Sequence, residues 1–165
     1  MATLSPKADT VDEELHDAPS TVHRLRALTV ELDLLGSEFG RTNGLHPTDV
    51  RALICLLDAR RHSTAATPGW LGQQLGLESA SVTALIDRME RAGHVGRTRD
   101  AHDRRKVLLS VTPSAIALGQ AFFGPLIDRA SAELAQFSDS EQKLIDRFLA
   151  RMQAAVTIAR NHEQP

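Results

Sequence analysis

Two short helical patterns separated by three residues constrain the fold of this 165-residue chain more than any other feature. The first pattern begins at Thr67, an N-cap residue followed by proline, and ends near Leu75, where Gly76 suits the left-handed conformation that closes a helix. The second pattern begins near Ser79 and ends at Gly93. Two helices joined by so short a turn are typical of a helix-turn-helix.

A β-hairpin is predicted directly behind the second helix. Residues 95–99 and 106–112 each fit a short strand, and the polar, charged segment 100–105 between them fits a turn. Thr112 is an N-cap residue before Pro113 and begins the next helix. The sequence therefore predicts a mainly α fold with a small β-hairpin wing, that is, a winged helix-turn-helix.

Longer amphipathic helices are predicted on both sides of this core. Apolar residues recur at steps of three or four over residues 22–39, and a second helix opens with Thr48 as its N-cap. Further along the chain, Gly124-Pro125 predicts a kink or a break in a helix. Ser138 and Glu141 have the spacing of a capping box that starts the last helix.

The apolar stripes of the first and last helices need a surface to cover them, because burying one large aliphatic side chain is worth roughly 1.5–3 kcal/mol. We expect both helices to pack against a second copy in a homodimer; the alternative is a monomer in which they fold back on their own domain. The predicted organisation is a flexible acidic arm over residues 1–19, a dimerisation helix over 20–44, a winged helix-turn-helix DNA-binding domain over 45–112 and C-terminal dimerisation helices over 113–160.

The composition excludes several classes of protein. The chain has 19 Lys and Arg against 21 Asp and Glu, and its single cysteine excludes a disulfide scaffold. It has no apolar run of the roughly 18 residues that a membrane-spanning helix needs. Its start lacks the basic and apolar regions of a signal peptide. We therefore expect a cytoplasmic protein without a membrane partner.

The charges are unevenly distributed, which indicates an anionic partner. Residues 88–106 hold seven Lys or Arg against three acids, although the whole chain has a formal net charge of −2. In a helix-turn-helix, the outward residues early in the second helix reach base edges in the major groove of DNA. Here those residues are Ser79, Ser81, Thr83, Ala84 and Arg88, while Arg104 and Arg105 at the hairpin tip suit a minor groove.

Asp103 is an acid in a tip that is expected to face phosphates. We expect its carboxylate to hold Arg88 or Arg105 in one orientation through a charge-assisted hydrogen bond; the alternative is a turn-forming role. The candidate DNA-binding residues are completed by Thr67, Val82 and Arg97.

Over residues 20–158 the chain resembles the MarR family of bacterial winged helix-turn-helix regulators. The resemblance rests on residues 71–77 (LGQQLGL), residues 82–95 (VTALIDRMERAGHV) and the wing, where Asp103 and Arg105 form an Asp-X-Arg motif ahead of a strand that ends in LSVT.

The resemblance implies an obligate homodimer, built from the terminal helices, that binds a pseudo-palindromic operator in double-stranded DNA. It also implies that Arg105 enters the minor groove and that Ser81, Thr83 and Arg88 lie in the major groove. We therefore expect a transcriptional repressor whose release from DNA is modulated by a small-molecule effector. The alternative is a winged-helix protein–protein interaction module that does not bind DNA.

MarR-like proteins respond to phenolic or other organic anions, to oxidants or to metals. Cys55 lies in an apolar run and is interpreted as a small core residue rather than an oxidant sensor. The resemblance places an effector pocket between the dimerisation helices and the DNA-binding domain. Its candidate ligand-binding residues are His23, Arg24, Arg26, His46 and Arg51.

The sequence contains no pattern that indicates catalysis, a cofactor or a metal. It lacks a Ser-His-Asp, Cys-His or phosphate-loop constellation, so we do not expect an enzyme. The seven histidines are scattered without the spacing of metal ligands and are interpreted as surface residues: His16, His23, His46, His62, His94, His102 and His162.

Overall fold

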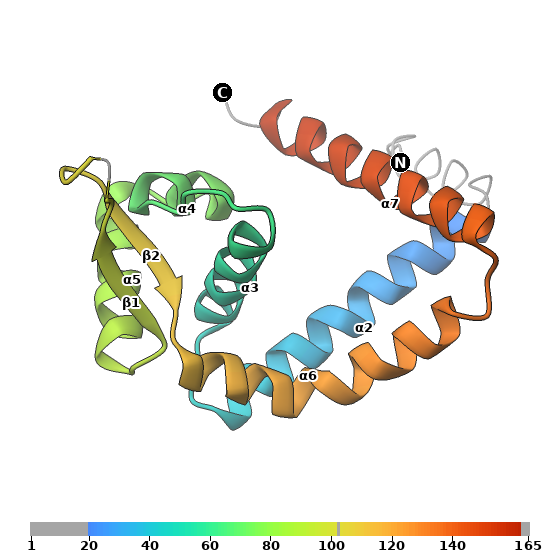
Figure 1. Ribbon diagram of the computed structural model, residues 1–165, viewed down its shortest axis with the longest axis horizontal. Coiled ribbons are helices and arrows are strands. Elements are labelled where there is room, and N and C mark those ends of the chain that lie inside the picture. The colour runs from blue at the N-terminus through green and yellow to red at the C-terminus, as the bar shows by residue number, and fades with distance from the viewer. Residues whose placement is uncertain (1–19, 102, 163–165) are drawn as a thin grey trace, which may run out of the picture. The chain divides into compact units, whose positions relative to one another are not determined.

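The computed structural model describes residues 20–101 and 103–162 (Figure 1). In this part of the chain, six helices and one two-stranded sheet confirm the predicted mainly α fold with a hairpin wing. The predicted acidic arm over residues 1–19 and the side chains of His16, His102 and His162 lie outside the described residues. The elements are α2 (Ser20–Thr42), α3 (Pro47–Arg61), α4 (Pro68–Leu75), α5 (Ser79–Arg91), β1 (Val95–Arg99), β2 (Val107–Val111), α6 (Pro113–Leu134) and α7 (Asp139–His162).

The chain divides into two compact units, one that extends to Ala115 and one that begins at Ile116. The core of the first unit lies where α4 and α5 meet, and its largest fully buried side chains are Leu71, Ile86 and Met89. Gly72 allows this close approach, since a Cβ atom on it would lie 3.0 Å from Val82 Cγ2 and 3.1 Å from the carbonyl oxygen of Leu77.

The predicted helix-turn-helix is confirmed together with the residues that end its helices. The hydroxyl of Thr67 accepts a hydrogen bond from the Trp70 N–H at 3.2 Å and caps α4. Gly76 closes α4 with φ of 65°, and Gly93 follows α5 with φ of 74°. Both angles lie in the left-handed region, which glycine adopts without steric cost.

The wing is an antiparallel pair in which Val95 lies opposite Val111 and Arg99 opposite Val107. The outer edge of β2 is partly paired, because the Leu109 N–H donates to the Ala66 carbonyl oxygen at 2.8 Å. The segment that precedes α4 therefore lies alongside the wing.

The predicted N-cap at Thr112 is confirmed and joins the start of α6 to the end of α5. Its hydroxyl accepts from the Ala115 N–H at 3.2 Å and donates to the Gly93 carbonyl oxygen at 2.7 Å. The start of α6 therefore lies next to the turn that follows α5.

Two local predictions differ from the structure. The N-cap of α3 is His46 rather than Thr48, because Pro47 already occupies the first helical position, where its missing N–H costs nothing. The His46 N–H instead donates to Asp49 Oδ2 at 3.0 Å. The sequence predicted a kink or a break at Gly124-Pro125. The helix does not break there, because α6 continues through Pro125.

The capping interaction predicted at the start of α7 is confirmed. The N–H and the hydroxyl of Ser138 both donate to Glu141 Oε2, at 2.8 Å and 2.6 Å. These two hydrogen bonds lower the pKa of the Glu141 carboxyl below its ordinary value, and the bond from the hydroxyl has the larger effect.

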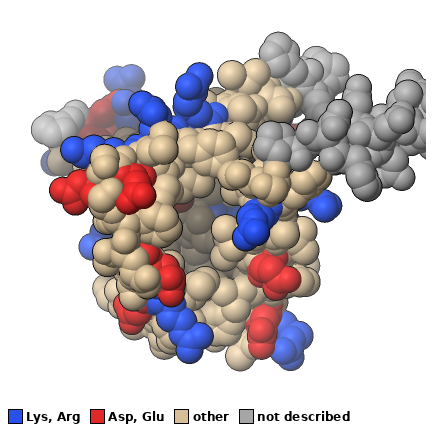
Figure 2. All heavy atoms as spheres, turned by 90° about the vertical axis from the view of Figure 1, so that its right-hand side faces the viewer, with Lys and Arg blue, Asp and Glu red and all other residues tan. Residues whose placement is uncertain are grey.

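Many large apolar side chains on α2, α6 and α7 are exposed. Along α2, Phe39 is buried, whereas Leu28 and Leu32 are about half exposed. No side chain described in α7 is buried, and Leu144 and Leu149 are among those in contact with solvent. On the face drawn in Figure 2, uncharged residues cover most of the visible surface, with groups of both signs between them. Each of these helices therefore carries large apolar side chains that are in contact with solvent.

Candidate nucleic-acid interface

Helix α5 presents four of the predicted DNA-binding residues to solvent. Ser79, Ser81, Thr83 and Ala84 are all exposed in its first half. The Thr83 hydroxyl donates to the Ser79 carbonyl oxygen at 2.9 Å, which leaves its lone pairs available as acceptors. These small side chains form a surface that another molecule can approach closely.

Two predicted DNA-binding residues have structural roles instead. Val82 is only 2% exposed and packs over Gly72, so it cannot contact DNA and the prediction is wrong for this residue. The Thr67 side chain is half-buried and caps α4, as described above.

Arg88 extends from α5 to a buried carboxylate on α3. Its Nη2 atom lies 2.5 Å from Asp49 Oδ1 and its Nε atom 3.3 Å from Asp49 Oδ2. The Asp49 side chain is 5% exposed and also accepts the N–H of His46. The hydrogen bonds to Asp49 raise the pKa of Arg88, an effect that desolvation partly opposes. The prediction that Asp103 holds Arg88 is therefore wrong.

Arg97 fastens β1 to α5. Its Nη2 atom lies 2.5 Å from Asp87 Oδ1, and its Nη1 atom contacts Glu90 Oε2. The hydrogen bond to Asp87 is the main cause of the raised pKa of Arg97. Because two carboxylates neutralise this guanidinium, it holds the wing against α5, and its contact with DNA stays a prediction.

Hydrogen bonds from backbone N–H groups to two carboxylates shape the tip of the wing. Asp100 Oδ1 accepts the Asp103 N–H at 2.9 Å, and Asp103 Oδ1 accepts the Arg105 N–H at 3.1 Å. The Lys106 N–H donates to the Asp103 carbonyl oxygen at 2.8 Å. Asp103 is thus a turn-former that contacts the backbone of Arg105, which was the alternative interpretation.

The wing also carries four exposed basic residues, which we call the wing cations. None of them forms an ion pair in the part of the chain that the structure describes, unlike Arg88 and Arg97. Their charges therefore remain available to an anionic partner. The wing cations are Arg99, Arg104, Arg105 and Lys106.

The acids that hold Arg88 and Arg97 were not predicted from the sequence. Asp49 lies 39 residues from its partner, and no local spacing relates the two. Asp87 and Glu90 lie three residues apart on α5, so their carboxylates share one helix face. That spacing was the only signal that could have indicated a bound cation.

The candidate effector residues are not brought together in the first unit. His23, Arg24 and Arg26 lie in the first turns of α2, whereas His46 follows its last turn, about 30 Å further along the chain at 1.5 Å per helical residue. Arg51 lies 4.0 Å from Asp33 of α2, with both side chains exposed. No group of three potential metal ligands occurs among the described residues, and no described helix is long and apolar enough to span a membrane.

Comparison with known proteins agrees with this architecture. The model of the MarR family matches residues 43–106. The regulator YcgE of Bacillus subtilis is 31% identical over 132 residues, which cover 80% of this chain and 83% of YcgE. The repressor YetL of the same organism is 27% identical over 106 residues, 64% of this chain and 62% of YetL.

Solved structures share the fold at lower sequence identity. A point mutant of MepR from a multidrug-resistant clinical isolate of Staphylococcus aureus superposes with a TM-score of 0.67 at 18% identity, over 85% of this chain and 99% of that one. MepR in its complex with DNA has a TM-score of 0.53 at 19% identity, over 82% and 98% of the two chains. Given the extent of its match to YcgE and the family model over its helix-turn-helix, this chain belongs to the MarR family of winged helix-turn-helix transcriptional regulators.

Proposed function

We propose that the protein is a repressor that binds double-stranded DNA at a pseudo-palindromic operator, as a homodimer in the cytoplasm. The observation that supports this proposal most directly has two parts. Helix α5 exposes small polar residues, and the hairpin that follows it carries the wing cations, whose charges no described carboxylate neutralises. Short polar side chains can reach base edges, and free Arg and Lys side chains neutralise phosphates. Helix α5 is then the recognition helix.

The exposed apolar side chains of α2, α6 and α7 support the homodimer. A single soluble chain rarely exposes so many large apolar residues along three helices, and a second copy would cover them. Two recognition helices must lie about 34–36 Å apart to enter successive major grooves of one DNA face. A dimer with that spacing reads two half-sites related by a two-fold axis.

Effector control is the remaining part of the proposal. A small organic anion that binds one arrangement of the dimer more tightly shifts the population toward that arrangement, and DNA affinity changes by the same differential free energy. The related protein YetL is named a transcriptional repressor. This likeness is the reason for proposing repression rather than activation here.

Selection of bound fragments from the host genome tests the proposal. We expect the purified protein to enrich one inverted repeat and Arg105→Ala to weaken its binding about tenfold or more, as for loss of a groove contact. Arg61→Ala is the matched control, because Arg61 is already paired with Asp58 at 3.1 Å on α3.

The salt dependence separates this function from a protein–protein interaction module. DNA affinity should fall steeply with salt, because each phosphate that a Lys or Arg neutralises releases counterions, whereas binding to a protein partner should be almost flat in salt and insensitive to Arg105→Ala. Failure to enrich any motif at low salt would contradict DNA binding and favour the interaction module.

A further inference from the structure

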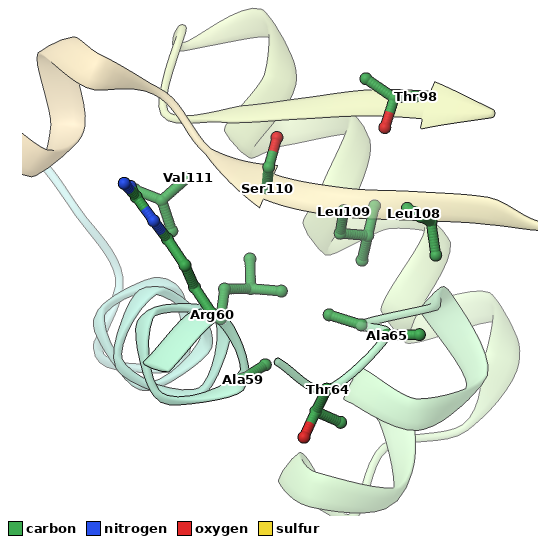
Figure 3. A pocket seen from close by; sticks show the side chains of 11 residues that line it. Ala59, Arg60, Thr64, Ala65, Thr98, Leu108, Leu109, Ser110 and Val111 are labelled. Atoms are coloured by element: carbon green, nitrogen blue, oxygen red, sulfur yellow. The ribbon is translucent and has the colours of Figure 1, made fainter. Parts of the chain in front are cut away.

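A cavity lies between the second half of α3 and strand β2, wholly within the first unit. Its volume is about 240 Å³ and it is open to solvent; residues 64–66 border it on a third side, where the Ala66 carbonyl oxygen accepts the Leu109 N–H. Ala59 of α3, Ala65 and Leu109 of β2 are among the residues that line it (Figure 3), so much of its surface is small and apolar. No role described above uses this cavity.

One end of the cavity holds a cation. The side chain of Arg60 rises from α3 and places its guanidinium beside Val111 (Figure 3). In the described part of the chain Arg60 forms no ion pair, whereas the adjacent Arg61 pairs with Asp58 on another face of the helix. The guanidinium of Arg60 is therefore able to bind an anion.

A backbone donor faces the same edge. The Thr112 N–H donates to the His94 carbonyl oxygen and the Asp100 N–H to that of Lys106, each at 3.0 Å, so even-numbered residues form the hydrogen-bonded pairs of the hairpin. Odd-numbered residues of β2 consequently direct their peptide groups outward. The Leu109 N–H already does so toward Ala66, and the Val111 N–H, two residues on, faces outward at the end of the cavity where Arg60 lies.

We infer that this cavity binds a small organic carboxylate, with its ring or branched chain over Ala59, Ala65 and Leu109 and its carboxylate on Arg60 and the Val111 N–H. The volume suits such a ligand, since a dry cavity of about 150 Å³ already accommodates benzene. A guanidinium and an amide donor together satisfy a carboxylate, and charge-assisted bonds of this kind are the stronger ones.

The position of this site couples it to the wing, and in this respect the inference rests on the proposed function. A ligand here contacts both α3 and β2, and β2 leads directly from the tip that carries Arg104 and Arg105. If the ligand binds more tightly to a wing position that does not fit DNA, it lowers DNA affinity by the same factor.

Direct binding to the full chain without DNA tests the site. Benzoate is the probe and benzamide its uncharged analogue, each titrated into ¹⁵N-labelled protein and followed by amide chemical shifts. We expect benzoate to shift the amides of Ala65, Leu109 and Val111 with a Kd of about 1 mM or tighter, and benzamide to bind at least about tenfold more weakly.

Three variants make the test specific. Arg60→Ala should weaken benzoate binding about tenfold through loss of the cation, and Ala65→Leu should weaken it by filling the cavity from an exposed position. Arg61→Ala should leave benzoate binding unchanged.

The outcomes separate this inference from the proposed function. Absence of saturable shifts, or equal affinities in wild type and Arg60→Ala, would overturn the carboxylate site even if operator binding is intact. Saturable binding in a protein that recognises no operator would support the site and refute the regulator. Benzoate that binds the cavity yet leaves operator affinity unchanged would overturn the coupling to the wing.

Discussion

Arg88 lies on α5, the proposed recognition helix, but two of its guanidinium nitrogens face Asp49 on α3. The sequence predicted its position on the outer face correctly, since its side chain is 45% exposed. It did not predict the partner, because helical periodicity reports which face a residue occupies and contains no information about a carboxylate 39 residues away. The same holds for Arg97, which is one cation of a basic segment in the sequence but lies beside Asp87 and Glu90 in the structure.

Replacing Arg88 should destabilise the fold. Arg88→Ala leaves the buried Asp49 carboxylate without its cation, and we expect the free energy of unfolding to fall by about 2–3 kcal/mol. Urea denaturation followed by the fluorescence of Trp70, on α4, measures this change. Arg91→Ala is the control, because the Arg91 Nε donates only to the backbone of its own helix at Asp87. Equal losses in the two variants would show that the ion pair contributes nothing.

At the scale of elements, the helices and the hairpin were predictable because their signals are local. Caps, glycines after helices and apolar steps of three or four all lie within a few residues of the boundary that they mark. The two differences have physical causes. Pro47 can occupy a first helical position, which moves the cap back by two residues from Thr48. Pro125 removes one helical hydrogen bond, and the carbonyl of Ala121, an exposed residue, can bond to water instead.

The cap of α7 should make its stability depend on pH. Because hydrogen bonds from Ser138 lower the folded-state pKa of Glu141 below 4.5, their stabilisation is complete above that value and is lost as the pH falls through the folded-state pKa. Thermal unfolding followed by circular dichroism should show a lower Tm for Glu141→Gln than for wild type at pH 6, with a difference that shrinks toward pH 3. Glu133→Gln, one helix earlier, is the control. A difference that stays constant over this range would contradict the assignment.

At the scale of the whole molecule, the sequence predicted which helices carry apolar stripes, and the structure shows that many of these side chains, such as Leu28 and Leu149, are exposed. It could not predict the cavity beside the wing. That space is lined by residues of α3, residues 64–66 and the two strands, which lie far apart in the sequence and have no spacing in common. Cavities arise from how elements pack, and a periodic pattern describes only one element at a time.

The proposed homodimer predicts how a single charge should affect assembly. Leu149 is 45% exposed on α7, and Leu149→Glu should convert the protein from dimer to monomer, because a carboxylate would be desolvated in the apolar contact. Sedimentation velocity measures the change, and operator affinity should fall with it. Ala154→Glu introduces the same charge at an exposed position of α7, five residues on and therefore about 140° around the helix from Leu149, and should leave a dimer. A monomeric wild-type protein at micromolar concentration would refute the assembly.

The residues that fasten α5 and the residues that it presents outward are different sets. Arg88 and Asp87 with Glu90 tie the helix to α3 and to β1, while Ser81 and Ala84 take no part in those bonds. Substitutions at the outward positions should therefore change the stability of the fold very little, so they can accumulate during evolution. A lineage could redirect such a protein to new target sequences by changing a few short side chains while its scaffold stays as it is.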